Sequence, residues 1–267
     1  MSVSKTYLLV VTASITASLP LASTARGDEP QASLVASSGA GPAVAADPNL
    51  DRGFLLPTAM TQPAGTITYN NYELLLHGLT YGITDKLQVS ATVLSPITKD
   101  MPFFGMASLK GRVLSTSRFN LALQGSVGTG VALGDQEGSA LILGSGALAS
   151  FCLREDCSSL LSTSATYTFA NASGADEGGH LILYGASIVH RVGNHVKLLG
   201  EVVSGSTRTS NEDADNFPGF AANYGVRFFT GNIAGDIGFI KPIGNDDTDT
   251  DDFLLGLPFV NVSYRWQ

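Results

Sequence analysis

The 267-residue chain has little charge, and this shortage narrows the class of protein. Only 14% of its residues are charged, against roughly 25% in an average soluble domain. The net charge of −8 argues against nucleic-acid binding, which needs basic patches. After the first 25 residues no uninterrupted apolar run approaches the about 18 residues of a membrane-spanning helix. We therefore expect no helical membrane span in the mature chain.

The first 25 residues have the composition of a cleaved secretory signal peptide. Lys5 is the only charge in a short start, residues 7–22 are almost entirely apolar or small, and small residues follow. This order is typical of export signals, and the core is shorter than a span of about 20 residues. No cysteine lies in the first 150 residues to carry a lipid anchor. We expect cleavage after Ala25 or Gly27; the alternative is a buried N-terminal helix.

Most of the remaining chain alternates between apolar and polar residues, with the period of two that a strand imposes. In residues 119–133, Phe119, Leu123 and Val127 share one face, and small or polar residues share the other. A soluble sandwich would turn the large face inward, whereas a membrane barrel would turn it outward. We predict strands at residues 65–72, 74–83, 87–97, 106–114, 119–133, 139–151, 158–170, 180–191, 196–207, 219–229, 232–241 and 253–266.

Short and long connections alternate between these strands. Outer-membrane barrels have short periplasmic turns on one rim and longer loops on the other. Counted back from a last strand that ends in the periplasm, every short turn falls on the periplasmic side, and this requires an even number of strands. The pattern predicts an all-β fold, an antiparallel transmembrane β-barrel of about 12 strands, with about 10 as the fallback.

The zone before the strands, residues 26–52, is rich in Ala, Ser, Gly and Pro and shows no period. Such a segment buries too little apolar surface to offset its ordering entropy. We expect a disordered periplasmic segment here; the alternative is a short plug that enters the barrel. Residues 53–267 are then the outer-membrane barrel.

The chain ends on a strand whose outer face is apolar and aromatic. Its residues on that face are Val260, Val262, Tyr264 and Trp266. The strand resembles the closing strand of bacterial outer-membrane β-barrels, in which a terminal amphipathic strand with an aromatic end is the assembly signal. Residues 57–59, Gly65, Tyr69 and the stretch Tyr81-Gly82-Ile83-Thr84-Asp85-Lys86-Leu87 resemble the start of a group of uncharacterised, porin-like bacterial outer-membrane barrels.

This resemblance implies an outer-membrane location and a role in transport, and it carries over no catalytic residues. The expected partners are outer-membrane lipid and lipopolysaccharide, the barrel-assembly machinery, and a small solute. We expect no nucleic acid, cofactor or metal.

Several charged residues fall on predicted inward faces, because a charge that faces lipid is costly. They are Lys110, Arg112, Lys197, Glu201, Arg227, Asp236 and Arg265. A two-residue turn at Thr230-Gly231 would make Arg227 and Asp236 diagonal neighbours within reach of each other. Such an ion pair would either stiffen the lumen or line a pore and select solutes by charge.

The other candidate sites give weaker evidence of function. Cys152 and Cys157 are the only cysteines; in an exported protein they predict a disulfide, which here would clamp a hairpin turn. The acidic run at residues 245–252 lacks the glycine and glutamate of a calcium-binding EF-hand loop. It is interpreted as a solvated loop or as a loose divalent-cation site. Ser187 and His190 lie on opposite strand faces and cannot cooperate.

The sequence therefore predicts passive small-solute transport or a structural membrane role, without enzymatic activity. The alternatives from other classes are a lipid-active outer-membrane enzyme and a soluble secreted β-sandwich that binds a ligand. The sandwich would bury its large apolar faces against each other.

Overall fold

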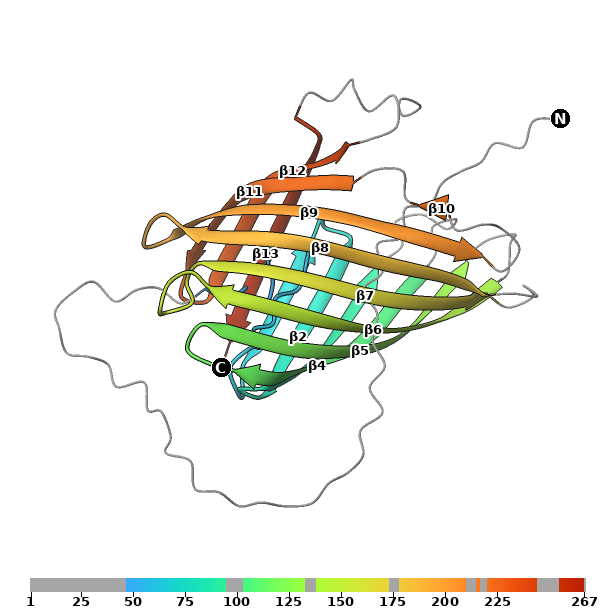
Figure 1. The fold of residues 1–267 in the computed structure, drawn as a ribbon, viewed down its shortest axis with the longest axis horizontal. Coiled ribbons are helices and arrows are strands. Elements are labelled where there is room, and N and C mark those ends of the chain that lie inside the picture. The colour runs from blue at the N-terminus through green and yellow to red at the C-terminus, as the bar shows by residue number, and fades with distance from the viewer. Residues whose placement is uncertain are drawn as a thin grey trace, which may run out of the picture.

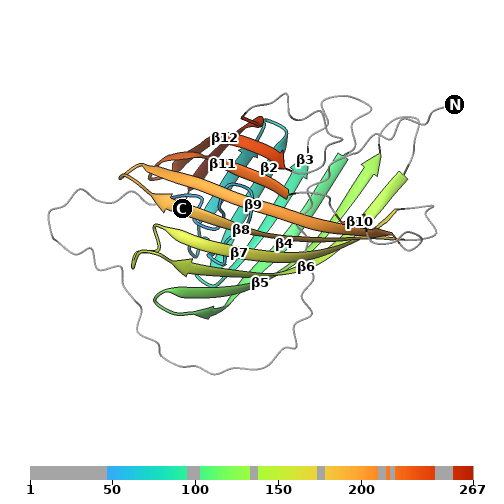
Figure 2. The ribbon, with the colours of Figure 1, turned by 45° about the horizontal axis from the view of Figure 1, so that its top comes forward.

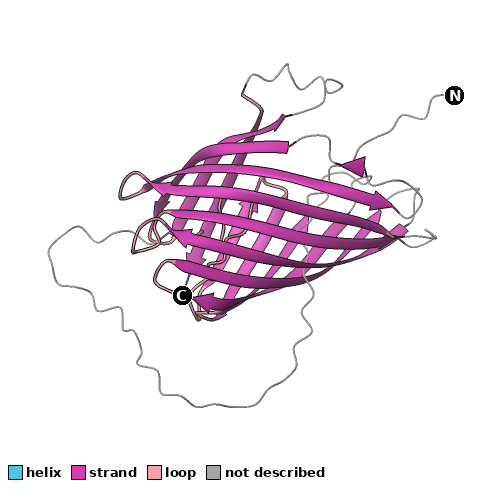
Figure 3. Ribbon diagram, viewed as in Figure 1, coloured by secondary structure: helices cyan, strands magenta, loops and turns pink. Residues whose placement is uncertain are grey.

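The structure is a computed structural model and describes residues 47–94, 103–132, 138–172, 178–209, 215–216, 220–243 and 255–266. Within these ranges no helix is long and apolar enough to cross a lipid bilayer. The described ranges contain thirteen strands, coloured magenta in Figure 3. They are β1 (Ile67–Tyr72), β2 (Leu76–Thr84), β3 (Leu87–Leu94), β4 (Phe103–Ser115), β5 (Phe119–Ala132), β6 (Gly138–Cys152), β7 (Leu160–Ala172), β8 (Gly179–Arg191), β9 (Val196–Thr209), β10 (Asp215–Asn216), β11 (Phe220–Thr230), β12 (Ile233–Ile243) and β13 (Leu257–Trp266).

Twelve of these strands close into an antiparallel barrel (Figures 1 and 2). Each strand pairs with its neighbour in sequence, except that β9 pairs with β11, and the ring closes where β1 pairs with β13. The two-residue strand β10 lies outside this ring and pairs only with β9. The predicted antiparallel barrel of 12 strands is confirmed. A closed ring leaves no unpaired edge, so the backbone polar groups of every strand can pair within the sheet.

The alternation of β13 shows which face of the barrel is outside. Val262 and Tyr264 are 53% and 44% exposed, whereas Asn261 and Ser263 are fully buried. The same pattern recurs on β5, where Leu123 is 51% exposed. A soluble sandwich would show the reverse, with its large apolar side chains inside, so that alternative is wrong. The polar side chains face a lumen, and the apolar ones face outward.

The two ends of the barrel differ. We call one the turn end, because it carries the short connections at residues 85–86, 116–118, 153–159, 192–195 and 231–232. The other, the loop end, carries the connection at 73–75. The acidic run at 245–252 lies outside the described residues.

One predicted register needs correction. The turn between β11 and β12 is Gly231-Asn232 rather than Thr230-Gly231, so Thr230 pairs with Ile233. Gly231 has a φ of +49°, which a residue without Cβ adopts easily. The shift places Arg227 directly opposite Asp236 instead of diagonally.

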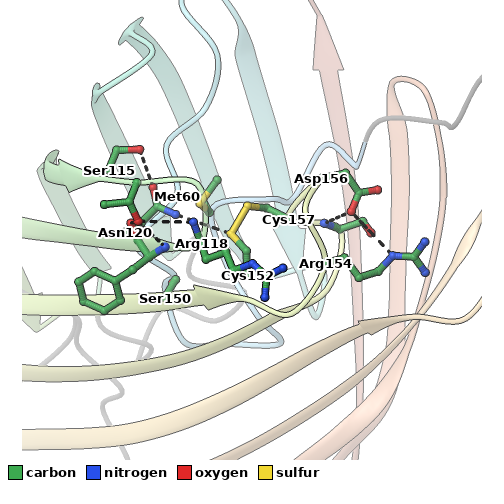
Figure 4. Close-up of a disulfide and its surroundings, with 12 residues drawn as sticks. Met60, Ser115, Arg118, Asn120, Ser150, Cys152, Arg154, Asp156 and Cys157 are labelled. Carbon is green, nitrogen blue, oxygen red and sulfur yellow. Dashed lines mark hydrogen bonds and ion pairs between the residues drawn. A yellow bond between two sulfur atoms is a disulfide. The ribbon is translucent and has the colours of Figure 1, made fainter. Parts of the chain in front are cut away.

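The predicted disulfide is present between Cys152 and Cys157, at the turn end of β6 and β7 (Figure 4). The backbone N–H of Cys157 donates to the carbonyl of Arg154 at 3.0 Å, inside the clamped turn. Cys152 is fully buried and belongs to an apolar cluster against which Met60 packs. The disulfide thus closes a turn whose inner side touches the contents of the barrel.

The residues before β1 run inside the barrel, where Figure 2 shows them in blue. We call residues 47–66 the re-entrant segment. Its first six residues, 47–52, were predicted to be disordered, but the structure places them among buried wall residues. The reason is that their polar atoms meet complementary groups on the wall, which the composition of the segment alone does not reveal. Residues 26–46 lie outside the described residues.

Candidate functional site

The re-entrant segment enters at the turn end, turns back near mid-barrel and returns to β1. Its bend is closed by the N–H of Gly53, which donates to the carbonyl of Leu56 at 2.8 Å. The N–H of Thr58 donates to the carbonyl of Asp51 at 2.9 Å and joins the two arms. At the return, the N–H of Gly65 donates to the carbonyl of Gly82 on β2 at 2.8 Å. The segment is therefore a short hairpin held inside a closed ring.

Arg227 on β11 is the centre of the contact between wall and segment. Its guanidinium is fully buried and makes two hydrogen bonds to the carboxylate of Asp236, Nε to Oδ1 at 2.7 Å and Nη2 to Oδ2 at 3.1 Å. The same group donates to the carbonyls of Asn49 at 2.8 Å and Gly53 at 2.5 Å. Paired, bidentate geometry is what makes a buried arginine tolerable. Arg227 thereby ties the segment to the wall.

A second group of cations surrounds the start of the segment. The Nζ of Lys197 donates to Oδ2 of Asp47 at 2.7 Å, and Nη1 of Arg227 donates to the same oxygen at 3.2 Å. Nη1 of Arg265 donates to the backbone carbonyl of Asp47 at 3.4 Å. Although burial raises the pKa of Asp47, Arg227 and Lys197 lower it further, so the net shift is downward. Asp47 is therefore a buried carboxylate held by basic wall residues.

The tip of the segment is held by Glu201 on β9. The carboxylate accepts the backbone N–H groups of Phe54 at 2.5 Å, Leu55 at 2.9 Å and Leu56 at 3.0 Å. Nδ2 of Asn223 donates to the same carboxylate at 3.3 Å. Three successive amides on one carboxylate form a strong charge-assisted contact in a place that excludes water.

Phe54 fixes the tip by packing. Its ring is fully buried, with its centroid 4.7 Å from that of Phe259 on β13. Directly paired glycines on β11 and β12, Gly225 and Gly238, lie beneath the ring, where an added Cβ would come within 2.9 Å and 2.8 Å of its atoms. These glycines hollow the wall so that an aromatic ring fits.

The opposite wall holds the returning arm. Nζ of Lys110 on β4 donates to the carbonyls of Asp51 and Thr58, both at 3.1 Å. The N–H of Ala59 donates to Oγ of Ser150 on β6 at 2.9 Å. The segment is thus held by wall strands on both sides of the lumen.

The seven charged residues predicted to face inward are distributed in three places. Lys197, Glu201, Arg227, Asp236 and Arg265 gather on neighbouring strands β9, β11, β12 and β13 around the segment. Lys110 lies on the far wall. Arg112 lies near the turn end, where its Nη2 donates to the carbonyl of Asp85 at 2.6 Å.

Sequence reasoning missed the residues that these charges hold. Asp47, Asp51 and Arg52 lie before the first strand, in the zone expected to be disordered. Nη2 of Arg52 donates to Asp236 at 3.4 Å, and its guanidinium carbon lies 4.6 Å from the ring centre of Tyr72. The available signal was a cluster of charges in a charge-poor chain, directly before strands that put charges inside.

Comparisons with known proteins show a similarity of fold to solved structures. No protein-family model matches the chain, and no curated protein matches its sequence. The solved OmpTdeltaL8, a loop deletion mutant of OmpT of Vibrio cholerae, is 10% identical, with a TM-score of 0.47 over 72% of this chain and 62% of the other. The NanC porin is 6% identical, with a TM-score of 0.45 over 75% and 97%. LpxR from Salmonella typhimurium is 9% identical, with a TM-score of 0.37 over 75% and 98%.

The chain spans 62% to 64% of the length of the Vibrio cholerae OmpT chains that it matches. One expectation needs correction at this point. The chain was predicted not to be an enzyme, and this prediction is withdrawn, because a likeness at 6% to 10% identity shows the barrel fold alone. The architecture gives no support to a non-enzyme assignment.

Proposed function

We propose that the protein is exported and inserts in the bacterial outer membrane, where it passes a small solute passively. In this proposal the re-entrant segment closes the lumen, and conduction requires the segment to leave its place. The observation that carries the proposal is a closed barrel whose buried inner wall is polar and charged, and whose charges hold a segment of the same chain inside the lumen.

The outer face supports the membrane location. Many of its large apolar residues are exposed on the strands, up to 58% at Val113, which would be unfavourable in water but suits a lipid-facing wall. Tyr264 and Trp266 lie at the turn end with ring centroids 5.2 Å apart. Aromatic residues gather at membrane interfaces. Outer-membrane lipid and lipopolysaccharide would surround this face, and the terminal strand would be the contact for the barrel-assembly machinery.

The hairpin form of the segment supports its removal as a unit. Its bend and its two arms are joined by its own backbone hydrogen bonds. It enters and returns at the same end, so it leaves without threading through the ring. Its contacts with the wall are made largely by individual wall side chains, among them Glu201, Arg227 and Lys110.

A structural role is the second candidate, and one observation favours it. Phe54 joins an apolar cluster inside the lumen that includes Leu160, Val189 and Leu199 from the wall. A lumen packed in this way resembles the core of a soluble protein, and a segment that never leaves would make the barrel a rigid membrane element.

Conductance distinguishes the two. We define the opened variant as the full chain with Phe54→Ala and Glu201→Gln. Wild type and opened variant are inserted in planar lipid bilayers after membrane fractionation and a heat-modifiability gel have shown that each is folded. We expect almost no steps from wild type and stepwise conductance from the opened variant. The matched control, Glu155→Gln in an exposed turn, should behave as wild type. A folded opened variant without steps would contradict transport and support the structural role.

A further inference from the structure

We propose that Lys197, Arg227 and Arg265 form a binding site for the carboxylate of a small anionic solute, and that Asp47 occupies this site while the re-entrant segment is in place. The inference rests on the proposed transport function and adds the class of solute. It makes the segment an internal substitute for the solute as well as a closure.

The geometry around Asp47 is that of a carboxylate site. An ammonium group and a guanidinium group reach the same oxygen, Oδ2, from two strands, at 2.7 Å and 3.2 Å. The side chains of Lys197, Arg227 and Asp47 are 4%, 0% and 5% exposed, so the interaction is screened little by solvent. Charge-assisted hydrogen bonds of this kind are the strong ones.

Arg265 extends the site beyond what Asp47 uses. It is 5% exposed, and its Nη1 reaches only the backbone of Asp47. Its Nε has no hydrogen-bond partner within the part of the chain that the structure describes. A solute carboxylate, which is not constrained by a peptide backbone, is able to engage this third cation.

The wall without the segment has an excess of positive charge. Of the seven inward charged residues named above, five are basic and two, Glu201 and Asp236, are acidic. Asp236 and Arg227 pair with each other, and the remaining five residues still carry an excess of positive charge. The segment brings Asp47, Asp51 and Arg52, a net charge of −1, so its departure leaves the lumen more positive. A narrow passage lined by one sign of charge concentrates the opposite sign.

The charge of the segment is therefore matched to the site that it fills. A neutral solute would not require two buried cations at one oxygen, and burying such cations is unfavourable without an anion. A cation would be repelled by the same groups. The site fits a small carboxylate-bearing solute that competes with Asp47.

The first test measures ion selectivity of the opened variant. In a potassium chloride gradient, its reversal potential should report chloride permeability about threefold or more above that of potassium. Adding Lys197→Gln should reduce this ratio at least twofold, whereas Lys86→Gln, which removes an exposed charge in a turn, should leave it unchanged. An unselective or cation-selective opened variant would overturn the proposal.

The second test does not depend on conduction. Asp47→Asn removes the internal carboxylate while keeping its shape. The unfolding temperature of this full-length variant in detergent, read from the heat-modifiability gel, should rise in acetate relative to chloride at equal ionic strength. The rise should disappear in Asp47→Asn with Lys197→Gln, and wild type should show little of it. An equal response in all three proteins would overturn the carboxylate site, even if no variant conducts. Conversely, an opened variant that fails to conduct while this acetate response appears would refute transport and keep the site.

Discussion

Replacing Glu201 with glutamine should release the tip of the re-entrant segment without unfolding the barrel. The carboxylate accepts three backbone N–H groups, from Phe54, Leu55 and Leu56. Glutamine keeps one acceptor oxygen and presents an NH2 group to donors, so about two of these bonds are lost. Hydrogen bonds to charged groups contribute about 1.5–3 kcal/mol each, which gives about 3–6 kcal/mol in total.

This loss has a direct readout in hydrogen exchange. At about 1.4 kcal/mol for each factor of ten, exchange at the three tip amides should accelerate roughly 10²- to 10⁴-fold. Mass spectrometry on the detergent-solubilised barrel measures this in a peptide that spans the tip. Peptides from β5 and β6 should exchange as in wild type. Glu155→Gln, whose carboxylate is 92% exposed, provides the matched control. Unchanged exchange at the tip, with the wall intact, would refute the assignment of Glu201 as the anchor.

Three further changes test other parts of the structure. Phe54→Ala leaves the hollow in the wall unfilled and should weaken the binding of the segment by about 3–5 kcal/mol. Proteolysis before β1 should then be faster, and resistance to protease equal to that of wild type would contradict the role of the Phe54 ring. Leu123→Arg places a charge on the outer belt and should lower folding stability in lipid vesicles by about 2–4 kcal/mol, most if the site lies near the bilayer midplane; no loss there would argue against a lipid-facing wall. The folded-state pKa of Asp47 is lowered. Its ionised carboxylate therefore stabilises the bound segment above the ordinary pKa of 3.8, and this stabilisation is lost as pH falls below that value. Exchange at the start of the segment should therefore rise in acid more in wild type than in Asp47→Asn, and equal acid responses would refute the Asp47 anchor.

The barrel was predictable from sequence because its signals are local. Strict alternation in strands such as Phe119–Ala132 fixes which side chains share a face, and short turns fix the neighbours. The disulfide followed from two cysteines in one turn. The inward placement of Arg227 followed from the period of two together with the cost of a charge that faces lipid.

The contents of the barrel were not predictable in the same way. The contacts of Asp47 with Lys197 and of Phe54 with Phe259 join residues that lie far apart in the chain. The segment has neither a period nor a large apolar content, and its order comes from a wall that other residues build. Register also escaped prediction where a single turn position decides it, as at Gly231.

The central claim is that residues 47–66 occupy the lumen, and a pair of introduced cysteines tests it most directly. Nδ2 of Asn49 lies 2.8 Å from Oγ of Ser263 on the inner face of β13. Asn49→Cys with Ser263→Cys should form a disulfide on mild oxidation of cell envelopes, seen as protection of both thiols from labelling. Asn49→Cys with Tyr264→Cys, whose second position faces outward, should stay open. Equal labelling of the two pairs would contradict the account.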